Sequence, residues 1–182
     1  MPELGTGQSL ATSAGVPTPT TVSVLSEQNA VSVTGDGWGI NMNIPEASGT
    51  VQDDNGQPVI RLIQSSMASM SGSGMQPGTI ASVWFFSEPT LMGTVAVAED
   101  GSFTLDVMVD AQFIPAGNHT VQVQGVGTDG YIKSVNMGVL VEEPPAPTTA
   151  SEASVMLWWV LSFLVALALG LVVLVLIRRR AA

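Results

Sequence analysis

The sequence predicts a mainly β protein, an antiparallel β-sandwich followed by one C-terminal transmembrane α-helix. From residue 20 to residue 141, apolar and polar residues alternate in short stretches that turn residues separate. This alternation is typical of antiparallel strands with one face on a core and the other in water. The second observation is an apolar run without a polar face, from Val155 to Ile177. Such a run is typical of a helix that crosses a bilayer, where lipid cannot satisfy backbone polar groups.

Residues 1–19 are predicted to form a flexible leader. They consist mostly of Gly, Thr, Ser and Pro, and they end in Pro17-Thr18-Pro19. A segment with so little apolar content cannot bury enough surface to offset the entropy that it would lose on ordering. The sandwich is therefore expected to begin at residue 20.

Strands are predicted where the alternation is strictest. The segment 80–86 differs, because it is more continuously apolar, and we expect it to be a central strand covered on both sides. The alternating segments are 31–34, 40–44, 103–109, 121–124 and 135–141.

Turn residues stand between these segments. Gly in an Asp-Gly or Asn-Gly pair adopts the positive φ that tight hairpins require, and Pro-Gly pairs mark other turns. These pairs occur at Asp36-Gly37, Asn55-Gly56, Pro77-Gly78, Asp100-Gly101 and Asp129-Gly130. Short strands separated by such turn residues favour a β-sandwich over a parallel sheet.

Residues 142–154 are predicted to be an extended stalk, because they are rich in Pro, Thr and Ser and have no apolar period. At about 3.1 Å per residue, the stalk would reach up to about 40 Å. Residues 155–177 then form the membrane-spanning helix, about 35 Å long at about 1.5 Å per residue. A buried core helix is the alternative, but it would show a polar face.

The flanks of the apolar run predict its orientation. Arg178, Arg179 and Arg180 follow it directly, and clustered basic residues stay on the cytoplasmic side. Trp158 and Trp159 lie near the other end, where amphipathic rings suit the headgroup level. We therefore expect a single-pass protein of the plasma membrane, with residues 20–141 extracellular and a cytoplasmic tail at residues 178–182.

The start of the chain does not match this topology. An exported domain normally follows a signal peptide, and residues 1–7 have neither a basic region nor an apolar one. We expect that the chain is a fragment or that its start is wrongly assigned. The alternative is a cytosolic N-terminal part, for which the charge rule would fail.

Small residues recur every four positions in the apolar run, at Ser162, Ala166 and Gly170. A stripe of this kind lets two helices approach closely, so it predicts a homodimer through the helix. Small residues are also common in membrane spans that do not associate. The lipid bilayer is the other partner that the run implies.

Charge and cysteine content exclude several classes of protein. The net charge is −10, and all 15 acidic residues precede the apolar run, against only Arg61 and Lys133. This imbalance argues against nucleic acid and anionic lipid as ligands. The chain has no cysteine, so it can form neither disulfides nor thiolate metal sites.

An ordered series of motifs occurs between residues 68 and 141. The series is Ser71-Gly-Ser-Gly-Met-Gln-Pro-Gly-Thr79, Val83-Trp-Phe-Phe-Ser87, Leu91-Met-Gly-Thr94, Asp100-Gly-Ser-Phe103 and Pro115-Ala-Gly-Asn-His-Thr120. It resembles the immunoglobulin-like modules of bacterial, especially actinobacterial, cell-surface proteins. Met75 stands where these modules usually have Phe. The resemblance implies an immunoglobulin-like sandwich with a structural or adhesive role and no catalytic residues, and the absence of an L-P-x-T-G motif makes the helix the expected anchor.

Three local patterns resemble functional sites. His119 is the single histidine, so a Ser-His-Asp arrangement would need it, but no strained nucleophile turn is present and a role in shaping a turn is favoured. Asp53-Asp54-Asn55-Gly56 resembles the start of a calcium loop, but the later ligands are missing and a hairpin turn is favoured. Asn118-His119-Thr120 is a glycosylation sequon that is favoured to be a chance match.

These observations predict a membrane-anchored surface protein that presents a β-sandwich for adhesion, envelope structure or partner binding. A surface protein or a glycan is the expected partner, and no enzyme activity, cofactor or metal is expected. The alternative is a membrane-anchored sensor or accessory subunit that acts through helix–helix contacts. A tethered hydrolase is disfavoured, because the sequence shows no constellation of acid, base and nucleophile.

Overall fold

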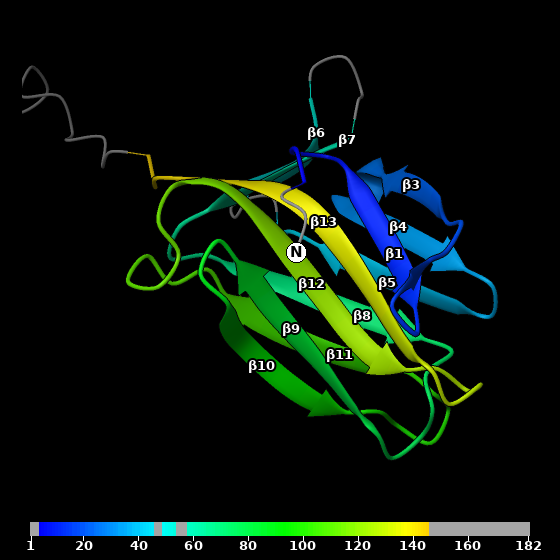
Figure 1. Cartoon of the computed structure of the whole chain (residues 1–182). Helices are drawn as coiled ribbons and strands as arrows, with labels where there is room; N and C mark the ends of the chain where they lie inside the picture. The colour runs from blue at the N-terminus through cyan, green and yellow to red at the C-terminus, as the bar shows by residue number, and fades with distance from the viewer. Residues whose placement is uncertain (1–3, 46–48, 54–57, 146–182) are drawn as a thin grey trace, which may run out of the picture. The chain divides into compact units, whose positions relative to one another are not determined.

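The structure, a computed structural model, describes residues 4–45, 49–53 and 58–145, and these residues form a sandwich of two β-sheets (Figure 1). Sheet A has the strand order β10-β9-β12-β13-β1-β2, with β7 beside β13 and β6 beside β7. Sheet B has the order β11-β8-β5-β4-β3. The prediction of a mainly β, antiparallel sandwich is confirmed.

The strands have the following bounds. In sheet A they are β1 Ser9–Ser13, β2 Val16–Pro17, β6 Gly49–Gln52, β7 Pro58–Ile63, β9 Ile80–Phe86, β10 Thr90–Ala96, β12 Gly117–Val126 and β13 Ile132–Glu142. In sheet B they are β3 Thr21–Leu25, β4 Ala30–Gly35, β5 Trp38–Asn43, β8 Met67–Ser73 and β11 Phe103–Met108. A 3₁₀ turn, Ser26–Gln28, joins β3 to β4.

Alternate residues of the strands fill the space between the two sheets. Val121 and Val123 of β12 are fully buried, and so are Ile40 and Met42 of β5. Burying a side chain of this size contributes about 1.5–3 kcal/mol. The residues between them face outward, as the alternation of the sequence predicts.

Two strands share one edge of β13, whose other edge pairs with β12. β1 pairs with it antiparallel, from Ser9 opposite Met137 to Ser13 opposite Lys133. β7 pairs with it parallel, from Ile60 opposite Val139 to Ile63 opposite Glu142. The first strand of the chain therefore lies inside sheet A, and not in the flexible leader that the sequence predicts for residues 1–19.

β1 escapes sequence-based prediction because its stability comes mostly from backbone pairing. Its sequence is Ser-Leu-Ala-Thr-Ser, and Ala11 is its one buried residue, at 2% exposure. The residues before it are also held: the N–H of Gly138 donates to the carbonyl of Gln8, and the N–H of Gly7 donates to the carbonyl of Gly138. These contacts do not require a large apolar side chain.

β9 differs in part from its prediction. It lies between β10 and β12, and Ala81, Val83 and Phe85 face the core. Its other face is not covered, since Trp84 and Phe86 are only half-buried there. The continuous apolar run of β9 therefore marks an aromatic outer surface and not a strand buried on both sides.

The predicted turns are confirmed where the structure describes them. Gly37, Gly78, Gly101 and Gly130 all have φ between 74° and 80°. Residues 54–57 are not described, but β6 and β7 pair antiparallel on both sides of them, as a hairpin requires. The choice between a hairpin turn and a calcium loop there lies outside the described residues.

The described residues up to Pro144 form one compact unit. Most of the stalk predicted for residues 142–154, the helix predicted for 155–177 and the tail at 178–182 lie outside the described residues. Glu142 is the last residue of β13. Within residues 4–45, 49–53 and 58–145, no helix is long and apolar enough to cross a membrane.

Candidate functional site

Five strands of sheet A place one residue each in a row across the outer face of the sheet. The register pairs Leu91 with Trp84, and Trp84 with Gln122. The row continues from Gln122 to Asn136 and from Asn136 to Leu10. Directly opposite residues of neighbouring strands lie on the same face, and four strand spacings span about 19 Å. Polar and aromatic groups from distant parts of the chain thus share one surface.

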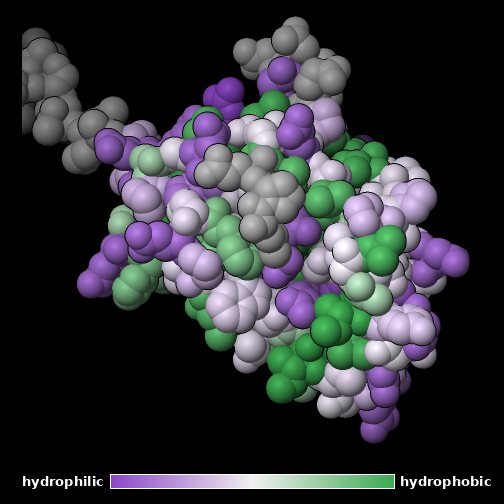
Figure 2. Space-filling model, in the orientation of Figure 1, coloured by the Kyte–Doolittle hydropathy of each residue, from purple (hydrophilic) through white to green (hydrophobic). Residues whose placement is uncertain are grey.

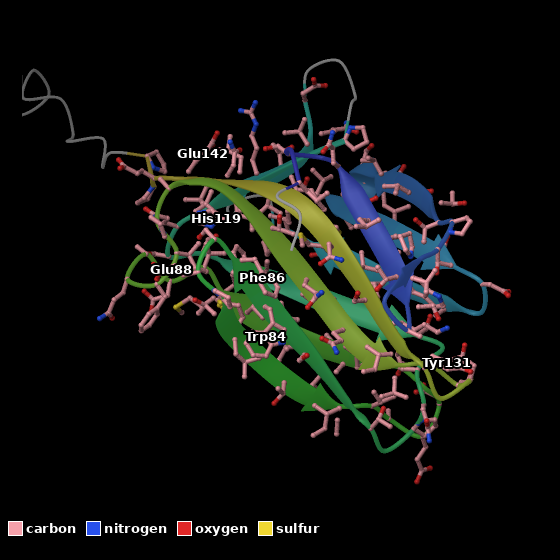
Figure 3. All side chains as sticks on the ribbon, in the orientation of Figure 1. Trp84, Phe86, Glu88, His119, Tyr131 and Glu142 are labelled. Carbon is pink, nitrogen blue, oxygen red and sulfur yellow. The ribbon has the colours of Figure 1, made fainter. Side chains whose placement is uncertain are left out.

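Two aromatic rings lie side by side at the β9 end of this face (Figure 3). The ring centroids of Trp84 and Phe86 are 6.5 Å apart, and the ring planes differ by 28°. The indole N–H of Trp84 donates to the hydroxyl of Ser82 at 3.1 Å. This hydrogen bond satisfies the polar atom of the indole and restricts the orientation of the ring.

A hollow of about 550 Å³ opens at the other end of the face, next to Tyr131 (Figure 3). This volume lies in the range of small-molecule and cofactor sites. The residues that line it come from the β1–β2 turn, from β12, and from the β12–β13 turn with the first residues of β13. They are Thr12, Ala14, Gly15, Gln122, Gln124, Gly130, Tyr131, Ile132 and Ser134. We call this site the Tyr131 hollow.

The floor of the Tyr131 hollow is polar and ordered. The Thr12 and Ser134 hydroxyls lie 2.8 Å apart and share one hydrogen bond. The side-chain amide of Gln122 donates to the side-chain oxygen of Asn136 at 3.0 Å, and the amide of Asn136 donates to the Leu10 carbonyl at 3.1 Å. Gln122 and Ser134 are each 7% exposed. Buried polar groups of this kind keep their positions because moving them would leave hydrogen bonds unmade.

Two polar groups of the hollow lack a hydrogen-bonding partner among the described residues. Within the described part of the chain, neither the side-chain amide of Gln124 nor the hydroxyl of Tyr131 forms a hydrogen bond. The amide offers two donors and an acceptor, and the hydroxyl offers one donor and an acceptor. These groups can therefore bind a ligand without breaking an existing contact.

The outer face of sheet A carries almost no charge. β1, β9, β10 and β12 contain no Asp, Glu, Lys or Arg. The ammonium of Lys133 on β13 is occupied, because it donates to Asp129 at 2.6 Å and to the Ser13 hydroxyl at 2.8 Å. Figure 2 shows hydrophobic surface on this side only as separate patches between polar and weakly polar residues. Farther along the sheet, Arg61 of β7 and Glu142 of β13 form an ion pair at 3.5 Å. The uncharged part of the face is therefore the part formed by β1, β9, β10 and β12.

A second pocket, of about 310 Å³, lies beside His119. The Ser87 hydroxyl lies 2.9 Å from Nδ1 of His119, and Nε2 lies 2.7 Å from the Pro115 carbonyl oxygen. Because a carbonyl only accepts, Nε2–H donates to Pro115 and Nδ1 accepts from Ser87. The turn-shaping role predicted for His119 agrees with these contacts, which join the ends of β9 and β12 to the β11–β12 loop.

This pair does not complete a hydrolase triad. The third group, which would stabilise an imidazolium, is here a carbonyl and not a carboxylate. Ser87 closes the Val83–Ser87 motif and follows β9, but no sequence pattern indicated that its hydroxyl contacts His119. Among the described residues, no three His, Asp or Glu side chains come close enough to hold a metal ion.

The remaining sequence-predicted site residues divide into two groups. Asn118 of the sequon is exposed at the start of β12, and its side-chain oxygen accepts from the Thr6 hydroxyl at 3.0 Å. The helix and tail residues lie outside the described part of the chain, so the structure does not test them. They are Trp158, Trp159, Ser162, Ala166, Gly170, Arg178, Arg179 and Arg180.

No protein-family model and no curated protein matches the chain. Among solved structures it is similar to a lytic polysaccharide monooxygenase of Jonesia denitrificans, with 16% identity and a TM-score of 0.33 over 50% of this chain and 63% of that one. It is also similar to the fibronectin(III)-like modules of Clostridium thermocellum CbhA, with 17% identity and a TM-score of 0.30 over 48% of this chain and 88% of theirs. A tetra-tandem repeat of a large adhesion protein is similar as well, with 16% identity and a TM-score of 0.36 over 77% of this chain and 43% of that one. At these identities and TM-scores, the similarities carry no functional assignment.

Proposed function

We propose that the protein is a membrane-anchored surface protein whose β-sandwich binds a partner through the outer face of sheet A, for adhesion or envelope structure. The observation that carries the proposal is the open face of β1, β9, β10 and β12, strands that contain no charged residue, with half-buried aromatic rings and the Tyr131 hollow. The opposite face of sheet A packs on the core, so of the two faces of this sheet only the outer one is free to contact a partner. Binding requires no chemistry beyond hydrogen bonding and ring contacts.

The strand order supports an immunoglobulin-like description of residues 58–142. β10-β9-β12-β13 in sheet A follows the C′-C-F-G order of immunoglobulin sandwiches, and β8 with β11 in sheet B follows B and E. β1 and β3 to β5 are then an N-terminal addition that extends both sheets. The sequence resemblance, which covers residues 68–141, falls within this unit.

The anchoring part of the proposal depends on the sequence of residues 142–182. A Pro-rich stalk, an apolar run and three arginines follow the sandwich in that order. In this topology the sandwich is extracellular, because basic residues stay cytoplasmic. The acidic charge of the sandwich is compatible with an exterior location and disfavours anionic partners.

Protease shaving of intact cells tests the topology. Cells would produce the full chain with an epitope tag after Ala182, and a broad-specificity protease would be added from outside. We expect loss of the sandwich, detected with an antibody against residues 20–141, and survival of the tag. A sandwich that resists digestion until the membrane is permeabilised would overturn the proposal.

We also propose that the helix self-associates through Ser162, Ala166 and Gly170, since small residues permit close helix approach. Fluorescence resonance energy transfer between tagged full-length chains measures this association. Gly170→Leu should reduce the signal, whereas Leu171→Ile, next to the stripe, should preserve it. An unchanged signal for Gly170→Leu would contradict the proposal.

A further inference from the structure

We propose that the Tyr131 hollow binds a neutral glycan, with the Tyr131 ring packed against a sugar ring and the Gln124 amide as the main hydrogen-bonding group. This inference rests on the proposed function, in which the outer face of sheet A contacts the partner. It adds the chemical class of that partner. Three properties of the hollow support it: an exposed ring on a fixed turn, unused polar groups on a rigid floor, and the absence of usable charge.

The first property is the position of Tyr131. Its side chain is 58% exposed, although large aromatic side chains usually bury most of their surface. Its backbone is nevertheless held, because its N–H donates to the Asp129 carboxylate at 3.1 Å, and the other oxygen of that carboxylate accepts from Lys133 at 2.6 Å. An exposed ring on an ordered turn loses little entropy on binding and offers a flat apolar surface. The C–H groups on one face of a sugar ring match such a surface.

The second property is the supply of hydrogen-bonding groups. A sugar hydroxyl both donates and accepts, so its best protein partners are groups that do both. The Gln124 amide has this capacity and has no partner within the described residues. Beside it, the shared hydrogen bond of Thr12 and Ser134 leaves acceptor positions open on both hydroxyls. The buried Gln122 and Ser134 side chains keep this floor in place.

The third property is charge. Lys133 supplies the one cation near the hollow among residues 4–45, 49–53 and 58–145, and its ammonium already contacts Asp129 and Ser13. A sulfated, phosphorylated or carboxylated glycan would therefore enter an acidic protein without a free basic side chain to receive it. A neutral glycan meets no such penalty. The lining of the hollow combines an exposed ring with the hydrogen-bonding side chains of Gln124, Thr12 and Ser134, and this mixture suits the C–H faces and hydroxyls of a sugar.

Affinity electrophoresis of the full-length chain in detergent tests the inference. Native gels would contain soluble mixed-linkage β-glucan, xylan, galactomannan or α-mannan, with polygalacturonate as the anionic comparison. We expect at least one neutral polysaccharide to retard the protein and polygalacturonate to have no effect. Tyr131→Ala and Gln124→Ala should each weaken the retardation at least about tenfold, as truncation of a central binding residue does. Tyr131→Phe should retain most of it, because the ring remains.

Matched control variants lie in the β11–β12 loop, at the opposite end of β12. Phe113 is 60% exposed and Gln112 is exposed, so Phe113→Ala and Gln112→Ala remove similar groups far from the hollow. They should leave the retardation unchanged, and thermal unfolding should show that all the variants are folded. Three outcomes would overturn the inference: that none of the four neutral polysaccharides retards the protein, that polygalacturonate alone retards it, or that the hollow and control variants have equal effects. Protease shaving is independent of these gels, so a wrong topology and a wrong ligand would be told apart.

Discussion

The hydroxyl of Ser87 lies 2.9 Å from Nδ1 of His119, the one histidine of the chain. His119 is 5% exposed, and its other ring nitrogen donates to the Pro115 carbonyl. Both nitrogens of a buried ring are therefore satisfied by groups from different segments. The Ser87–His119–Pro115 contact resembles a nucleophile with its base, but here it joins the end of β9 to the β11–β12 loop. We call this contact the clasp.

Removing the imidazole of this clasp should reduce the free energy of unfolding more than removing the Ser87 hydroxyl. His119→Ala loses two hydrogen bonds, and we expect the free energy of unfolding to fall by about 2–3 kcal/mol, since each bond is worth about 1 kcal/mol and a cavity remains. Ser87→Ala loses one bond at an exposed position and should cost about 1 kcal/mol. Urea unfolding of the full chain in detergent measures both. A loss for Ser87→Ala as large as that for His119→Ala would contradict the clasp.

Asp129 should make the sandwich sensitive to acid. The hydrogen bond from Lys133 is the main cause that lowers the pKa of Asp129 below its ordinary value of 3.8, and the backbone N–H of Tyr131 adds to it. Because this pKa is lower in the folded state, the unfolded chain binds more protons, and the stabilisation is lost as the pH falls below about 3.8 towards the folded-state pKa. Unfolding midpoints measured from pH 6 to pH 2 should show this loss.

Asp129→Asn is the matching variant, since an amide does not titrate in this range. It should be less stable than the natural chain at pH 6, because the buried ammonium of Lys133 keeps only the Ser13 hydroxyl. The difference between the two chains should shrink as the pH falls. Parallel curves for the two chains down to pH 2 would count against this role of Asp129.

Two glycines with the same backbone conformation should respond differently to alanine. Gly74 and Gly78 have φ of 74° and 75°, so each pays a similar cost of about 1–2 kcal/mol for a Cβ in the left-handed region. A Cβ on Gly74 would also lie 2.0 Å from the Gly37 carbonyl oxygen, whereas a Cβ on Gly78 meets nothing within 4 Å. Gly74→Ala should therefore destabilise by about 1–3 kcal/mol more than Gly78→Ala in urea unfolding. Equal losses would show that the Gly37 turn moves aside without cost.

The sequence was most informative where a strand buries large side chains. Val121, Val123, Val135 and Met137 alternate with polar residues, and they lie in the core as predicted. The same criterion failed for Ser9–Ser13, because pairing with β13 needs no apolar period. Alternation also failed to predict the outer face of β9. An apolar residue such as Trp84 gives the same sequence pattern whether another element covers it or it lies at the surface.

The Tyr131 hollow could not be predicted, because it depends on long-range register. Thr12 and Ser134 share a hydrogen bond across 122 positions of sequence, through a strand that the sequence did not reveal. The Asp129-Gly130 turn was predicted, but the position of the Tyr131 ring beside Gln124 follows only from the pairing of β12 with β13. Composition did predict one property of the site, since it already disfavoured anionic ligands.

Deletion of residues 1–19 should show that the first strand is part of the sandwich. β1 pairs five residues with β13 and buries Ala11. Loss of these hydrogen bonds, at about 1 kcal/mol each, should lower the free energy of unfolding by about 3–5 kcal/mol. The deletion also exposes the edge of β13 beside Val135 and Met137, and an open edge pairs with other chains. We therefore expect a lower unfolding midpoint in urea together with concentration-dependent association in sedimentation.

Ala11→Asp, which places a carboxylate in the core beneath the same strand, should lower the midpoint in the full-length chain as well. A deletion variant with an unchanged midpoint and no association would restore the flexible leader that the composition of residues 1–19 predicts.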